Sequence, residues 1–438
     1  MGDDGGMRAP EAVARRLGPL RDRPFRLLWI GQTASAVGDS LIPVAMAFAV
    51  LGLGGSATGI GLVLAAFTLP RVLLILVGGV WADRLPRQLV MVVADIVRGG
   101  VEIVFAWLLL TGGAHLWHLI VGAAVIGAAS AFFFPAATGL IPQTLRSERL
   151  QQGNALMSVS RSASGIIGPS ISGLLVVTIG PGWVFAADAA TFAISAASLL
   201  ALRLPSQAQI AASRGFLSEL AGGWREVVNR RWLLASIVTF GFSNVAMAPI
   251  FVLGPVIAQN KLGGPTAWGV IVTALGVGGL IGALIALRWK PRHPLATAFA
   301  LGTAFSLPMF ALAPPLALPV ILVAAATQSA VIDLTNTWWY TAMQQHVPPA
   351  ALSRVSSYDW LASIIFQPIG FSVAGPVALL IGAPATLIGA AVLSIGANLA
   401  VLSIPEVRRL TWVEGAGAEE RGRPRTGEGP IAGSIEME

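Results

Sequence analysis

The chain has 438 residues, of which 55% are hydrophobic and only 11% are charged. A soluble domain usually carries about 25% charged residues, so this composition excludes the ordinary soluble classes. The net charge of +7 does not indicate a nucleic-acid partner, because the basic residues lie in short segments between long apolar runs. Cysteine is absent, which excludes disulfides and thiolate chemistry.

A polar segment, residues 1–24, precedes twelve apolar segments, and each of these is about long enough to cross a ~30 Å hydrocarbon core as a helix. Membrane strands would be only about 9–11 residues long. The sequence therefore predicts an all-α membrane protein. The predicted spans are residues 25–51, 57–81, 88–111, 116–142, 157–179, 183–203, 232–259, 266–289, 295–313, 317–342, 355–381 and 384–404.

The loops between these spans alternate in charge. One set of loops holds nearly all of the basic residues, whereas the other set holds only Lys261. Basic loops lie on the cytoplasmic side of a membrane, and an even number of spans places both termini on that same side. The basic set consists of Arg84, Arg87, Arg146, Arg149, Arg203, Arg214, Arg225, Arg230, Arg231, Lys290, Arg292 and Arg354.

The longest loop, residues 204–231, divides the chain into two halves of six spans, residues 25–203 and 232–405. Apolar residues at helical spacing, such as Leu220 and Trp224, predict an amphipathic helix at the inner membrane surface within this cytoplasmic linker. A solvated linker is the alternative. The composition of residues 406–438, rich in Gly, Glu and Arg, predicts a disordered cytoplasmic tail.

A faint repeat links the two halves. Gly61-Leu-Val opens the second span and Gly269-Val-Ile opens the eighth, and each of these spans ends in a basic turn that contains proline. Transporters are commonly built from such internal repeats, with the binding site between them. The sequence therefore predicts two pseudo-symmetric six-helix bundles.

The turn after the second span reads Gly79-Val-Trp-Ala-Asp83-Arg84-Leu-Pro-Arg87-Gln88. It resembles the G-x-x-x-D-R-x-x-R-R signature of the major facilitator superfamily, with Gln88 in place of the final arginine. Physically, Gly79 allows close helix packing, Asp83 can face a helix N-terminus, and the arginines can pair with carboxylates or lipid phosphates. A latch that holds one conformation and a turn that only fixes topology are both compatible with this motif.

Two further segments resemble one branch of that superfamily. The first span, which contains Gly38-Asp39, is similar to enterobactin-exporter-like and macrolide-efflux-like members. The motif Gly165-Ile-Ile-Gly168-Pro169 with Gly173 resembles the fifth-helix motif of drug:proton antiporters. The fourth span departs from that group because it lacks the arginine that many of its members carry.

Ionisable residues inside the spans are costly and therefore indicate function. Asp39 and Arg71 lie near the middle of adjacent spans and are expected to meet, either as a proton or substrate site or as a permanent brace. The other candidates are Asp95, Arg98 and Glu102, which share one helical face, together with Asp188, Asp333 and Asn336.

These candidates carry different expectations. Asp95 and Arg98 lie near the cytoplasmic end, so we expect them to extend the gate motif, whereas Glu102 lies deeper and is the better proton carrier. Asp333 is expected either to contact substrate or to be a satisfied packing residue. Trp338, Trp339 and Tyr340 form either a drug pocket or, as preferred here, an interfacial belt.

Signatures of enzymes and of ATP-driven pumps are missing. Neither lysine follows a glycine, so there is no phosphate-binding P-loop, and the four histidines show no metal-ligand spacing. We therefore expect no catalytic residues, no metal site and no cofactor. The expected partners are a small-molecule substrate, protons and membrane lipids.

The resemblance implies a monomeric transporter in the bacterial cytoplasmic membrane that exports amphipathic compounds in exchange for protons. Five acids against two arginines among the candidates favour cationic or neutral substrates. A dedicated exporter of a siderophore or other secondary metabolite is the alternative, and it rests on analogy alone. A non-transporting membrane sensor or a lipid scramblase is a more distant one.

Overall fold

A computed structural model describes residues 18–204 and 224–413 of the chain, and every regular element within these ranges is a helix. The predicted amphipathic segment and the predicted tail fall largely on residues 205–223 and 414–438, outside the described residues. The side chains of residues 76–84 also lie outside them, as do those of Ser147 and several residues between 349 and 362.

Long helices occupy the first half of the chain. Short 3-10 turns, η1 (Gly18–Arg21), η2 (Ile141–Gln143) and η3 (Ser147–Arg149), flank them at one end of the molecule. The long helices are α2 (Arg23–Gly52), α3 (Ala57–Arg84), α4 (Arg87–Thr111), α5 (Leu116–Leu140), α6 (Leu150–Ile179) and α7 (Pro181–Leu200).

The second half has the same character but more breaks. The ninth and eleventh predicted spans are each built from consecutive helices rather than from one. The elements are α9 (Arg231–Ile257), η4 (Ala258–Leu262), α10 (Pro265–Ala286), α11 (Pro294–Gly302), η5 (Thr303–Ser306), α12 (Leu307–Leu312), α13 (Leu318–His346), α14 (Pro349–Ile365), α15 (Gln367–Ile381), α16 (Ala383–Val401) and α17 (Pro405–Arg409).

Within the described residues, eleven helical segments are long and apolar enough to cross a membrane. Each of the twelve predicted segments coincides with one helix or with a run of consecutive helices. Helix α4 is long enough to cross a membrane but is not among the eleven, because it carries three charged residues, Asp95, Arg98 and Glu102, among its apolar residues. Two predicted boundaries are displaced, since α6 begins at Leu150 and α14 begins at Pro349, each about two turns before the predicted start of its span.

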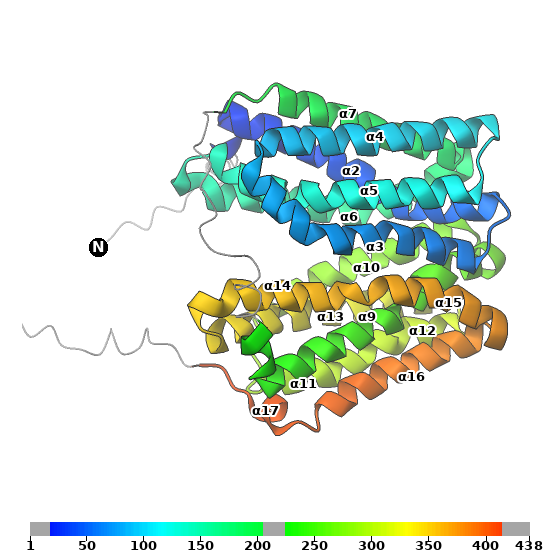
Figure 1. Ribbon diagram of the computed structural model, residues 1–438. Helices are drawn as coiled ribbons and strands as arrows, with labels where there is room; N and C mark the ends of the chain where they lie inside the picture. Colours follow the sequence, from blue (N-terminus) through cyan, green and yellow to red (C-terminus); the bar gives the residue numbers. More distant parts are fainter. Residues whose placement is uncertain (1–17, 205–223, 414–438) are drawn as a thin grey trace, which may run out of the picture.

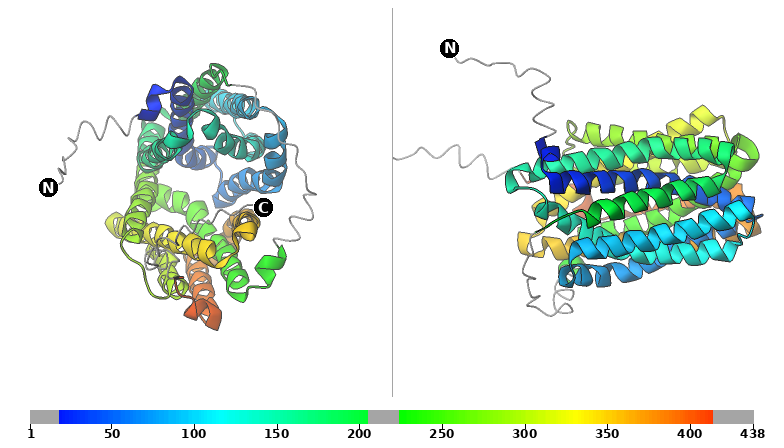
Figure 2. Two further views of the ribbon diagram at one scale, coloured as in Figure 1. Left: turned by 90° about the vertical axis from the view of Figure 1, so that its left-hand side faces the viewer. Right: turned by 90° about the horizontal axis from the view of Figure 1, so that it is seen from above.

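The helices form two groups, one above the other both in Figure 1 and in the end-on view on the left of Figure 2. In the first group α2 packs against α6 and α7, α4 against α5 and α7, and α3 against α5. In the second group α9 packs against α15 and α16, and α10 against α13. The two groups meet mainly through two helix pairs, α6 with α10 and α3 with α15.

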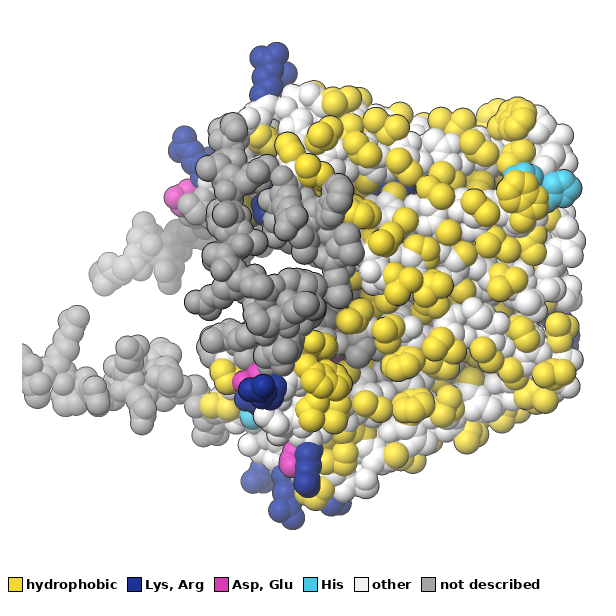
Figure 3. All heavy atoms as spheres, in the orientation of Figure 1, with side chains coloured by type: hydrophobic (Ala, Val, Ile, Leu, Met, Phe, Trp, Pro, Cys, Tyr) yellow, Lys and Arg dark blue, Asp and Glu magenta, His cyan; other side chains and the backbone are white. Residues whose placement is uncertain are grey.

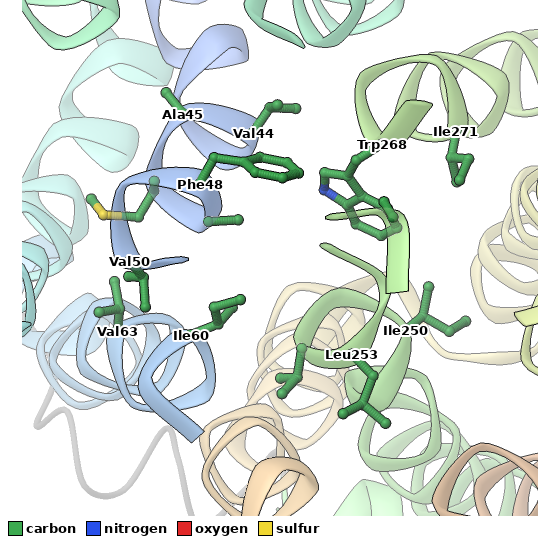
Figure 4. Packing of buried hydrophobic residues seen from close by; sticks show 14 of the residues in the cluster. Val44, Ala45, Phe48, Val50, Ile60, Val63, Ile250, Leu253, Trp268 and Ile271 are labelled. Atoms are coloured by element: carbon green, nitrogen blue, oxygen red, sulfur yellow. The ribbon is translucent and has the colours of Figure 1, made fainter. Parts of the chain in front are cut away.

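The hydrophobic packing differs between the two ends of the molecule. Near the α2–α3 connection one buried cluster is shared by both halves, and Figure 4 shows Phe48 of α2 facing Trp268 of α10 within it. Toward the opposite end each half has its own cluster, one around Phe25 and Leu199 and another around Trp232 and Val407. The halves are therefore joined at one end and packed separately at the other.

Glycine allows the close approach at the joined end. A Cβ atom on Gly269 of α10 would lie 2.4 Å from the Pro169 carbonyl oxygen of α6, and one on Gly61 of α3 would lie 2.2 Å from the Phe371 carbonyl oxygen of α15. The hydroxyl groups of Ser170 and Thr273 also hydrogen-bond across the α6–α10 contact at 2.7 Å. Any larger side chain at these glycines would push the two halves apart.

The surface agrees with a membrane-spanning body. On the face shown in Figure 3, lysine and arginine side chains gather toward the end near the chain termini, and hydrophobic side chains cover most of the remainder. Large apolar residues such as Trp107, Leu284 and Leu380 are exposed along the helices. Exposed apolar surface of this extent suits contact with lipid.

Candidate functional site

Helix α4 brings three ionisable side chains into the interior of the first half. Asp95, Arg98 and Glu102 are 1%, 2% and 2% exposed, so they share the buried face that their spacing predicts. The Arg98 Nη2 atom lies 2.5 Å from Asp95 Oδ1, and its Nη1 atom lies 3.8 Å from Oδ2 of Asp39 on α2. Arg98 thus connects α2 and α4 through two carboxylates.

Aromatic rings enclose the same guanidinium. The Arg98 Cζ atom lies 4.1 Å from the ring centroid of Phe133 on α5 and 4.4 Å from that of Phe192 on α7. A cation over an aromatic face is stabilised electrostatically, most strongly where water is excluded. Four helices of the first half therefore contribute to holding this one charge.

Asp39 forms the open edge of the network. Its side chain is 49% accessible although its partner Arg98 is buried, so a solvated ligand or proton can reach this carboxylate. The sequence predicted the wrong partner for Asp39. Its ion pair is with Arg98 and not with Arg71. Arg71 remains within electrostatic range of Asp39, and its guanidinium lies 4.8 Å from the Phe134 ring centroid.

Glu102 and Asp188 bring two carboxyl groups together at the closed side of the network. Each lies within electrostatic range of the other, and Asp188 also accepts a hydrogen bond from the Thr191 hydroxyl at 2.8 Å. Glu102 Oε2 and Asp188 Oδ2 are both buried without a partner. Two adjacent buried carboxyl groups titrate as a unit and can hold one proton between them.

A glycine places Asp188 beside the first helix. A Cβ atom on Gly38 would lie 1.8 Å from Asp188 Oδ1, so α2 can pass this carboxylate only because residue 38 has no side chain. The network therefore runs from Asp39 through Arg98 to Asp95, with the Glu102–Asp188 pair beside it. The prediction that Asp188 belongs to the ionisable pathway remains a prediction, now with a specific neighbour.

The predicted gate motif is described only in part. The side chains of Gly79, Asp83 and Arg84 lie outside the described residues. Arg87 donates a hydrogen bond to the Gly139 carbonyl oxygen at 2.7 Å, which ties the start of α4 to the end of α5. Gln88, which departs from the family signature, donates to the carbonyl oxygens of Leu199 and Leu202 at the end of α7.

The fifth-helix motif lies where α6 contacts both α2 and α10. A Cβ atom on Gly168 would lie 1.9 Å from Ser40 Oγ, and one on Gly173 would lie 2.6 Å from the Pro265 carbonyl oxygen. Pro169 faces Gly269 across the joint between the halves, whereas Gly165 has open space around its Cα. Three of the four motif residues thus lie at tight helix contacts.

The second half contains a polar cavity of about 290 Å³. Asn336 lines it, as predicted for a substrate-pathway residue, and Trp339 and Tyr340 line it too. Asp333 is not part of the lining, because its carboxylate lies against Gly279 of α10. The preferred belt interpretation is wrong for Trp338 and Trp339, since both are buried.

Two charged residues were not predicted. Asp359 of α14 is only 3% exposed, lines the polar cavity and accepts a hydrogen bond from Trp339 Nε1 at 3.1 Å. Its position inside the predicted span 355–381 was a signal that could have identified it. Arg161 of α6 was also passed over; its side chain is exposed, and together with Asp359 it leaves the predicted excess of three acids unchanged.

The comparisons with known proteins agree with this arrangement. The sequence profile of the Major Facilitator Superfamily matches residues 28–370. The multidrug efflux pump Tap of Mycobacterium tuberculosis H37Rv is 28% identical over 414 residues, covering 88% of this chain and 94% of the relative. The enterobactin exporter EntS of Shigella flexneri is 29% identical over 402 residues, covering 89% and 94%.

A solved structure shares the fold. The crystal structure of the nucleoside transporter NupG superposes with a TM-score of 0.72 at 11% identity, covering 86% of this chain and 98% of that one. The profile match covers more than half of the chain, and the membrane-length helices form the two packed groups described above. This chain belongs to the Major Facilitator Superfamily and is a multi-pass membrane transporter.

Proposed function

We propose that this protein is a secondary active efflux transporter that exports amphipathic small molecules in exchange for protons. The observation that carries the proposal is the buried ionisable network of Asp39, Asp95, Arg98, Glu102 and Asp188 inside the membrane-spanning body. Intramembrane carboxyl groups are typical of proton pathways. The relatives named as a multidrug efflux pump and an enterobactin exporter support the direction of transport.

The network contains two places that can each take up a proton, Asp39 and the Glu102–Asp188 pair. A proton that reaches the accessible Asp39 neutralises its charge and leaves Arg98 paired with Asp95 alone. The Glu102–Asp188 pair, which borders the same helices, can take up or release a second proton. Each protonation changes how strongly α2 is held to α4 and α7, and this couples charge to helix position.

We place α4 as the third of twelve spans, with both termini in the cytoplasm and the halves at residues 25–203 and 232–405. In this topology the joined end is the outer end, so the described conformation faces inward. The chain has no cysteine, so single cysteines test it directly. An impermeant maleimide should label Ser56→Cys on intact cells and Arg146→Cys only after the cells are opened. The opposite pattern would reverse the orientation.

The gate motif and the fifth-helix motif act as conformational contacts in this proposal. The motif ends beside Arg87 and Gln88, which tie the start of α4 to the ends of α5 and α7. Gly168, Pro169 and Gly173 shape the α6 surface that closes the outer end against α2 and α10. Neither set contacts cargo, so their substitution should alter turnover more than substrate affinity.

Transport in proteoliposomes tests the function. With ethidium as the substrate, we expect transport against its concentration gradient when a pH gradient is imposed, and none after an uncoupler is added. Glu102→Gln should abolish the driven component because the amide cannot carry a proton. Glu148→Gln, at an exposed position in η3, is the matched control and should transport normally. An equal rate with and without the gradient would disprove proton antiport.

Export of one dedicated metabolite is the second candidate, and the similarity to the enterobactin exporter favours it. This function predicts that deletion of the encoding gene stops secretion of a single siderophore or other secondary metabolite and leaves sensitivity to unrelated compounds unchanged. Increased sensitivity to several unrelated cationic compounds, with unchanged metabolite secretion, would favour multidrug efflux instead.

A further inference from the structure

The polar cavity in the second half lies between α9, α13 and α14 and has a volume of about 290 Å³. Pockets that bind small molecules are mostly apolar, with a few polar groups that fix the orientation of the ligand. This cavity is more polar, because its lining combines aromatic and aliphatic side chains with amide, hydroxyl and carboxyl groups. The lining residues that matter here are Phe240, Asn244, Asn336, Trp339, Tyr340 and Asp359.

Asp359 is incompletely satisfied in this cavity. Its Oδ2 atom accepts the hydrogen bond from Trp339, whereas its Oδ1 atom is buried without a partner. No lysine, arginine or histidine is among the residues that line the cavity in the described part of the chain. A buried carboxylate without a compensating cation or donor is costly, so a ligand that supplies either one gains affinity here.

Aromatic rings hold the Trp339 indole in place. Its ring centroid lies 5.0 Å from that of Phe240 and 5.8 Å from that of Trp232, both in edge-to-face geometry. The indole N–H in turn orients the Asp359 carboxylate. The cavity thus combines fixed aromatic faces with one free carboxylate oxygen, which suits a flat organic cation.

The carboxylates of the first half lie outside this cavity. Asp39 and Asp95 already share Arg98. In the second half, Asp333 lies against Gly279, outside the cavity lining. Asp359 is therefore the carboxylate that an organic cation entering this cavity would meet.

We propose that the cavity is a subsite for aromatic organic cations, in which Asp359 recognises the charge and Phe240, Trp339 and Tyr340 contact the flat ring system. This proposal rests on the efflux function and specifies its substrate class. The Oδ1 atom is covered in the described conformation, so the cation reaches it as the neighbouring side chains make room. Neutral compounds of similar shape use the aromatic contacts alone.

Equilibrium binding to the purified protein tests the proposal. Ethidium serves as the cationic probe and Nile red as the neutral aromatic probe. We expect Asp359→Asn to weaken ethidium binding at least about 10-fold and to leave Nile red binding within about twofold. The amide oxygen can still accept the Trp339 hydrogen bond, so the variant should fold.

Asp22→Asn is the control, because it removes a carboxylate that pairs with Arg149 far from this cavity in the fold. It should change neither affinity. Asp359→Glu, which restores the charge, should recover at least part of the ethidium affinity. Equal weakening of both probes in Asp359→Asn, or unchanged ethidium binding, would overturn the proposal.

The proposed function can fail separately. If the unaltered protein binds ethidium in an Asp359-dependent way but moves no ethidium in proteoliposomes, efflux is wrong and the subsite stands. If driven transport occurs and Asp359→Asn changes neither binding nor the rate for ethidium, the subsite is wrong and efflux stands.

Discussion

The two halves of this transporter use their buried charges differently. In the first half, Asp39 and Asp95 share Arg98, and Glu102 and Asp188 are neighbouring buried carboxyl groups, so each acid has another ionisable group beside it. In the second half, Asp359 stands beside aromatic and amide side chains in an open cavity. The first arrangement suits protons and the second suits a larger cation.

This difference indicates a division of labour. A proton needs only carboxyl groups that approach one another, and packed helices can provide these. A flat substrate needs volume and ring surfaces, which the cavity around Trp339 supplies. Because the two sites belong to different halves, coupling between them must pass through the joint where α6 meets α10 and α3 meets α15.

The largest expected effect concerns Arg98. Arg98→Met leaves Asp39 and Asp95 without their cation, and breaking a buried ion pair in this way costs about 3–5 kcal/mol. The thermal unfolding midpoint in detergent should fall strongly. Arg71→Met is the matched control, because Arg71 makes no ion pair among the described residues. Its unfolding midpoint should fall much less. An equal fall of the unfolding midpoint in both variants would show that the Arg98 ion pairs contribute no more to stability than an unpaired arginine does.

The joint between the halves comes next. Gly269→Leu would force a side chain against the Pro169 carbonyl of α6, and overpacking of this kind costs about 1–3 kcal/mol. The protein should shift toward the state in which α6 and α10 separate. A cysteine at Ser170 should then react faster with maleimide. Gly165→Ala, with open space around it, should leave the rate unchanged. Unchanged labelling in Gly269→Leu would show that this contact does not hold the joined end closed.

A polar tie within the first half should have a smaller effect. Gln88→Leu removes two hydrogen bonds to the end of α7, and each is worth about 0.5–1.5 kcal/mol. The unfolding midpoint should fall measurably. The same substitution at Gln143, whose bond to the Gly139 carbonyl is 3.4 Å long, should have less effect. A larger loss at Gln143 would contradict the role assigned to Gln88.

Asp39→Asn should change stability least, by less than about 1 kcal/mol, because Asp39 is half accessible and Arg98 keeps Asp95. Gradient-driven export should nevertheless stop, whereas energy-independent equilibration of the substrate continues. Adding Arg71→Gln should alter neither result, since Arg71 is not the ion-pair partner. Proton-driven export by the single variant would exclude Asp39 from coupling.

The helices were predictable from sequence because each apolar segment is long enough for the membrane whatever its neighbours are. The shared face of Asp95, Arg98 and Glu102 was predictable too, since it depends only on spacing along one helix. The partner of Asp39 was not. It depends on how α2 turns against α4 and α7, and Gly38 decides that packing by the space it leaves for Asp188.

Asp359 shows a second limit. It lies near the start of the predicted span 355–381, where a charged side chain usually reaches the membrane surface. Its burial follows from Trp339 on another helix, which sequence spacing within α14 does not reveal. The same tertiary contact explains why Trp339 is buried in the protein and does not lie at the membrane interface.

The shared core at the joined end implies a characteristic temperature dependence. In the proposed transport cycle, opening of that end exposes Phe48, Trp268 and their neighbours to water. Exposure of apolar surface raises the heat capacity, and its cost falls on cooling. The equilibrium between the two proposed access states should therefore give a curved van't Hoff plot, with the state in which the joined end is open gaining population in the cold.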